Sequence, residues 1–87
     1  MNNDIVNLAN NALKITEERI LENGSYGVYL HAKNQLKMII DIAISRNPSA
    51  DEKSVIDIDL MAVKELEVDD FDYASILCQV AYDFKRL

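Results

Sequence analysis

The chain has 87 residues, of which 49 % are hydrophobic and 28 % charged. This size and composition fit one globular domain, residues 1–87, and argue against a disordered chain. The net charge of −6 lies entirely in residues 51–87, because residues 1–50 carry five acids and five bases. The acidic half would repel a phosphate backbone, so we expect no nucleic-acid partner, whereas a basic protein would be attracted to it.

The single cysteine, Cys78, excludes an internal disulfide and fits a reducing, cytoplasmic setting. The N-terminal segment Met1-Asn2-Asn3-Asp4 is polar and acidic, so we expect no signal peptide. No apolar run approaches the length of a membrane span, and Asp41 interrupts the longest candidate. We therefore expect no contact with a membrane.

The first predicted helix covers residues 3–22, where apolar residues recur at three- and four-residue spacing. Asn2 or Asn3 can cap its N-terminus, and Asn23-Gly24 can end it in a left-handed conformation. Its expected buried face consists of Ile5, Leu8, Ala9, Ala12, Leu13, Thr16 and Ile20.

The second predicted helix covers residues 26–46, with Ser25 as its cap. Pro48 disfavours helical geometry in the residue before it, so the helix should end near Arg46. Its expected buried stripe consists of Tyr29, Ala32, Leu36, Ile39, Ile40 and Ala43.

The third predicted helix covers residues 49–67 and begins with a capping box between Ser49 and Glu52. Within it, residues 56–60 alternate like a half-buried strand, but a lone strand would have no partner, so we expect helix. The fourth helix should start at Asp69 or Asp70 and end near Arg86. Its expected apolar face consists of Tyr73, Ile76, Leu77, Val80, Ala81 and Phe84.

Short connections between long helices favour antiparallel neighbours. We therefore predict an all-α fold, an antiparallel four-helix up-and-down bundle.

Residues suited to catalysis are sparse. His31 is the only histidine, and no metal-ligand spacing, phosphate-binding glycine loop or paired carboxylates can be recognised, so we expect no metal and no cofactor. A nucleophilic pair of Cys78 and His31 would need chance packing. Phosphotransfer at His31, with Lys33 and Lys37 nearby, is a second alternative, although Asn34 stands where a lysine is usual. We expect no catalytic residues.

Residues 65–72 carry five acids and no base: Glu65, Glu67, Asp69, Asp70 and Asp72. We call these five residues the acidic corner. One or two acids at a helix N-terminus stabilise its free N–H groups. The remaining acids exceed that need and suggest a surface that binds a basic partner.

Two segments carry a resemblance to a known family. Ala32-Lys33-Asn34-Gln35-Leu36-Lys37-Met38-Ile39, and Ala62-Val63-Lys64-Glu65-Leu66-Glu67 followed by Asp70, are similar to the small helical immunity proteins of interbacterial type VI secretion. The resemblance covers roughly residues 24–82. Phe71 departs from it, since the family tends to have proline at that position.

The resemblance implies an immunity protein without enzymatic activity. It would bind a cognate effector that hydrolyses NAD and NADP, and occlude the active site of that toxin. We assign the acidic corner to contact with toxin cations, Tyr73 to the edge of that contact, and Lys64 to a structural ion pair. We assign Ala32, Leu36, Ile39, Ala62, Val63, Leu66 and Leu77 to the core.

Three alternatives stay open. The interface could instead lie on the second helix around Tyr29, His31 and Lys33. The chain could be a generic helical adaptor or a homo-oligomeric bundle, since apolar residues on both sides of the last helix allow a homodimer. The third is the phosphotransfer module centred on His31.

Overall fold

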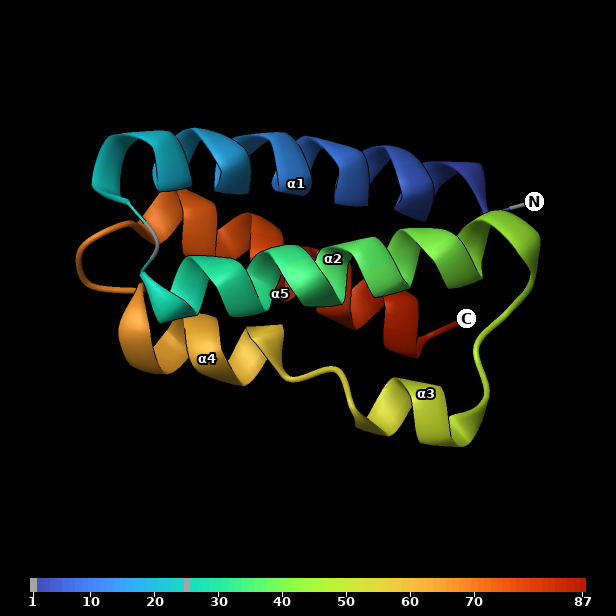
Figure 1. Cartoon of the computed structure of the whole chain (residues 1–87). Coiled ribbons are helices and arrows are strands. Elements are labelled where there is room, and N and C mark those ends of the chain that lie inside the picture. The colour runs from blue at the N-terminus through green and yellow to red at the C-terminus, as the bar shows by residue number, and fades with distance from the viewer. Residues whose placement is uncertain (1, 25) are drawn as a thin grey trace.

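The computed structural model describes residues 2–24 and 26–87 and is helical, as predicted. Its five helices are α1 (Asn3–Asn23), α2 (Gly27–Ser45), α3 (Ala50–Ser54), α4 (Ile58–Glu65) and α5 (Phe71–Lys85). In Figure 1, α1 and α2 lie side by side, α4 lies on the other side of α2, and α5 lies behind α2. None of the described helices is both long enough and apolar enough to cross a membrane.

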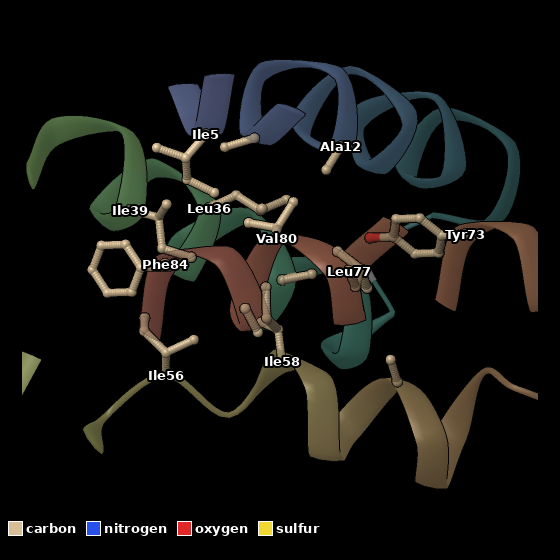
Figure 2. Close-up of a cluster of buried hydrophobic side chains, with 14 of the residues drawn as sticks. Ile5, Ala12, Leu36, Ile39, Ile56, Ile58, Tyr73, Leu77, Val80 and Phe84 are labelled. Carbon is tan, nitrogen blue, oxygen red and sulfur yellow. The ribbon is translucent and has the colours of Figure 1, made fainter. Parts of the chain in front are cut away.

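The core lies where α1, α2, α4 and α5 meet, as Figure 2 shows for Leu36, Ile58 and Leu77. Ile58, Leu36 and Leu77 are fully buried, although they come from three different helices. The three- and four-residue spacing brings these side chains to one face of each helix. The predicted stripes are largely confirmed, with Leu8, Leu13, Ile20, Ile40 and Ile76 packed at the edge of the core.

The prediction of a single third helix was wrong, because the backbone leaves the helix at Val55–Asp57. Gln35 of α2 takes up the backbone groups that this break exposes. Its side-chain oxygen accepts from the N–H groups of Asp57 (3.0 Å) and Ile58 (3.1 Å), and its amide donates to the carbonyl of Val55 (2.8 Å). These hydrogen bonds allow the backbone to leave the helix without an unpaired polar group. The side chains of Ile56 and Ile58, at the break and directly after it, are buried in the core.

The helix ends follow the predicted capping in part. The capping box is confirmed, since Ser49 Oγ accepts from the N–H of Glu52 and the Glu52 carboxylate accepts from the N–H of Ser49. Gly24 has a positive φ of 77° and ends α1, as predicted. Asn2 does not cap α1; its amide instead donates to the carbonyls of Ala43 and Arg46 at the end of α2. The predicted cap at Ser25 lies outside the described residues.

Candidate functional site

The acidic corner forms around the turn that joins α4 to α5. Glu65 is the last residue of α4, and the turn is closed by the N–H of Asp70, which donates to the carbonyl of Leu66 over 2.7 Å. Leu66 is buried and fixes the turn to the core, as predicted. The residues on either side of Leu66 therefore point to solvent.

Asp70 forms an ion pair within the chain and is not a free surface charge. Arg19 of α1 donates to both oxygens of its carboxylate, from Nε over 2.7 Å and from Nη2 over 3.2 Å. The hydrogen bond to Asp70 raises the pKa of Arg19. Its guanidinium also lies 5.6 Å from the centre of the Tyr73 ring, in cation–π geometry. This cluster ties the start of α5 to α1.

The assignment of Tyr73 to the edge of the contact was wrong, because its side chain lies in the core and is only 1 % exposed. Its hydroxyl is 2.6 Å from that of Thr16, which is also buried and donates to the carbonyl of Ala12. Burial raises the pKa of Tyr73 to about 12. Figure 2 shows the ring at the end of the core. Tyr73 thus supports the corner from inside.

The other four acids of the corner remain available. Glu65, Glu67, Asp69 and Asp72 are exposed, and none forms an ion pair within residues 2–24 and 26–87. Asp72 lies in the first turn of α5, where its charge favours the helix N-terminus. Glu65, Glu67 and Asp69 have no such role in stabilising a helix end.

Two further expectations for this region need correction. Lys64 is exposed and forms no ion pair with the described residues, so its assignment to a structural pair was wrong. Val63 is 57 % exposed and does not belong to the core. Lys85 pairs with Asp59 of α4 over 3.6 Å, away from the corner. The surplus acids of the corner therefore form no ion pair among the described contacts.

The alternative surface on α2 is largely used by contacts within the chain. Tyr29 is 8 % exposed, and His31 Nε2 lies 2.6 Å from a carboxylate oxygen of Asp57. Lys33 approaches Glu17 of α1 to 3.9 Å. A carboxylate beside His31 would also repel an incoming phosphoryl group, so these contacts favour a structural role for His31.

An apolar groove between α4 and α5 was not foreseen. It has a volume of about 910 Å³, and its lining includes Leu60, Val63, Phe71 and Tyr82. These side chains are 69, 57, 62 and 55 % exposed. The sequence could have indicated this groove, because Phe71 and Tyr82 fall on the side of α5 opposite Tyr73 and Phe84. The groove reaches Glu67, so it borders the acidic corner.

The groups considered for chemistry are not brought together. The Cys78 thiol points to the carbonyl of Asp59 over 3.8 Å, whereas His31 contacts Asp57. Burial raises the pKa of Cys78, which disfavours its nucleophilic thiolate. Among the described residues, no group of three or more histidines, cysteines and acids could hold a metal ion. The exposed charges and the apolar groove are features of a protein-binding surface.

Comparison with known proteins gives one match. Searches of curated proteins and of solved structures find no match to this chain. A family model described as Tsi6 matches residues 4–86, nearly the whole chain. Tsi6 is a family of immunity proteins of type VI secretion, in agreement with the resemblance carried by residues of α2 and α4. The chain therefore belongs to the Tsi6 family of type VI secretion immunity proteins.

Proposed function

We propose that this immunity protein neutralises a cognate toxin that hydrolyses NAD and NADP, by occluding its active site. The protein acts by binding alone and has no enzymatic activity of its own. The observation that carries the proposal is the set of exposed carboxylates that the fold does not use, Glu65, Glu67 and Asp69. The arrangement that presents them is an antiparallel up-and-down bundle in which α3 and α4 together take the place of the third helix.

The charge of the corner suits the chemistry of the proposed target. NAD and NADP carry phosphates, so a pocket that binds them is expected to be lined by cations and N–H donors. A group of carboxylates can occupy such a pocket in place of the phosphates. Charges of opposite sign also speed the encounter between two proteins. The partner is thus a basic cleft on a protein, not a nucleic acid or a membrane.

The geometry of the corner favours fast and specific binding. Asp70 is fixed by Arg19 and Leu66 is buried, so the turn is held before the toxin arrives. A surface that is ordered in advance loses less conformational entropy on binding. The carboxylates on either side of Leu66 can therefore meet the toxin with little rearrangement.

Co-expression tests the proposed target. The toxin encoded beside this gene is expressed in a susceptible cell with and without the immunity protein, and survival, NAD and NADP are measured. We expect the toxin alone to deplete both dinucleotides and the protein to restore them. A toxin that kills without lowering either dinucleotide would contradict the proposed substrate. Loss of both dinucleotides despite abundant folded protein would contradict the proposed inhibition.

A further inference from the structure

The outer side of α5 carries a second stripe, distinct from the face that packs in the core. It consists of Phe71, Ser75, Cys78, Tyr82 and Lys85, which follow one another at intervals of four, three, four and three residues. This is the spacing of a seam between two helices in a coiled coil. The large members Phe71 and Tyr82 are 62 and 55 % exposed, so the described part of the chain leaves most of these two side chains uncovered. Cys78 and Lys85 are half-buried, and both contact Asp59 of α4.

The stripe matches itself when it is read in the opposite direction. If two copies of α5 pack antiparallel about a point between residues 76 and 77, Phe71 faces Tyr82 of the second copy. Ser75 then faces Cys78 of the second copy, and small side chains at the centre allow the two helices to approach closely. Each contact occurs twice, as a two-fold axis requires.

The charges at the two ends of the groove agree with the same register. Glu67 lies in the turn before α5 and Arg86 directly follows α5, and both line the groove. Within its own chain, Arg86 donates to the hydroxyl of Tyr82. In the antiparallel arrangement, Glu67 of each copy faces Arg86 of the other, so opposite charges meet at both ends. Leu60 and Val63 of α4 line the same groove and would cover the flanks of the helix pair. Charge and shape are thus both self-complementary.

We propose that the protein forms a two-fold symmetric homodimer through the α4–α5 groove, with the two α5 helices antiparallel. The proposal does not depend on the toxin, because it concerns only contacts between two copies of this chain. The dimer leaves Glu65 and Asp69 outside the seam, since neither lines the groove. Glu67 belongs to both surfaces, so toxin binding and self-association are separated by variants at Glu65 and Asp69 on one side and at Phe71 and Arg86 on the other.

Charge exchange tests the register. The mass of the full chain in solution is measured by sedimentation as a function of concentration, without toxin. We expect the mass of two chains for the wild type. The variants Glu67→Arg and Arg86→Glu each place like charges together at both ends and should raise the dimer dissociation constant by about tenfold. The double variant restores opposite charges and should return to near the wild-type value.

Cross-linking tests the centre of the seam. The double variant Ser75→Cys, Cys78→Ser carries one thiol, which should face Cys78 of a wild-type second copy and cannot pair within its own chain. Burial raises the pKa of Cys78, so an equimolar mixture of variant and wild type is oxidised at alkaline pH, where we expect a covalent heterodimer with a 75–78 disulfide between chains. The matched control is Ser45→Cys, Cys78→Ser, which places the thiol at an exposed position at the end of α2 and should cross-link to the wild type only slowly. A circular dichroism spectrum checks that each variant is folded.

Three results would overturn the proposal. The first is a folded wild type that remains monomeric at its highest soluble concentration. The second is a dimer in which the double charge exchange fails to restore association, which would place the interface elsewhere. The third is a monomer whose Phe71→Ser variant loses affinity for the toxin, because the groove would then be a toxin contact.

Discussion

Loss of the Arg19–Asp70 ion pair should destabilise the protein measurably. The pair joins α1 to the start of α5 through two hydrogen bonds of 2.7 and 3.2 Å. The side chains of Arg19 and Asp70 are only 28 and 22 % exposed, so solvent screens the pair incompletely. Hydrogen bonds to charged groups contribute about 1.5–3 kcal/mol each in favourable sites, and partial exposure places this pair near the lower value.

The cation–π contact with Tyr73 adds about 0.5 kcal/mol. We therefore expect Arg19→Ala to lower the free energy of unfolding by about 2 kcal/mol, which corresponds to a fall in Tm of about 10 °C for a domain of this size. Urea denaturation followed by circular dichroism measures the effect. Lys14→Ala, on the exposed side of the same helix, is the matched control and should change stability little.

A double-mutant cycle isolates the pair. Arg19→Ala and Asp70→Asn are combined, and the loss in the double variant is compared with the sum of the two single losses. We expect a coupling energy of about 1–1.5 kcal/mol, because the second substitution has little left to remove. Losses that add within about 0.3 kcal/mol would refute the role of the pair in fixing the corner.

Three more perturbations test other parts of the structure. Gln35→Ala should destabilise the protein by about 1 kcal/mol in urea denaturation, because backbone groups at the break lose their partner and water replaces it only in part; a change within error would contradict the stated cause of the break. The pKa of Tyr73 in the folded protein, about 12, lies above its ordinary value of 10.0. The contribution of Tyr73 to the free energy of unfolding is therefore full below pH 10 and falls as the pH rises toward 12. Comparison of Tyr73→Phe with the wild type over that range should show a smaller fall in the variant, where the raised pKa of Tyr29 still contributes. The hydrogen bond from Arg46 lowers the pKa of Glu52 from 4.5 to about 2. The contribution of the Glu52 carboxylate to the free energy of unfolding is therefore full above pH 4.5 and is lost as the pH falls toward 2. An Arg46→Gln variant should lose less stability over that acid range, and a slope equal to that of the wild type would exclude the pair as the cause.

Local patterns predicted most of the helical structure. The spacing of Ala32, Leu36 and Ile39 places them on one face of α2, and all three are fully buried. The capping box at Ser49 needs only residues within one turn, which is why it could be read from the sequence. Burial and caps that depend on near neighbours are therefore predictable from a single chain.

Contacts between distant segments could not be read in this way. The break before α4 depends on Gln35, which lies more than 20 residues earlier in the chain. Asp70 was assigned with the rest of the acidic corner to contact with toxin cations, but Arg19, on another helix, binds its carboxylate. Tyr73 was predicted both on the apolar face of the last helix and at the edge of the toxin contact, and only the first is correct, because Thr16 and the core enclose it. In each case, helix packing decided an outcome that the local sequence left open.

The salt dependence of toxin binding tests the role of the acidic corner most directly. The affinity of the toxin is measured at several salt concentrations for the variant Glu65→Gln, Glu67→Gln, Asp69→Asn. The control variant, Glu18→Gln, Asp41→Asn, Asp51→Asn, loses the same charge at exposed positions elsewhere. Asp70 is left unchanged because Arg19 needs it.

We expect the corner variant to bind at least tenfold more weakly at low salt and with a shallower salt dependence, because rim charges act mainly through long-range attraction. The control variant should stay near the wild type in both quantities. A folded corner variant with unchanged affinity and unchanged salt dependence would contradict the assignment of these carboxylates to the toxin.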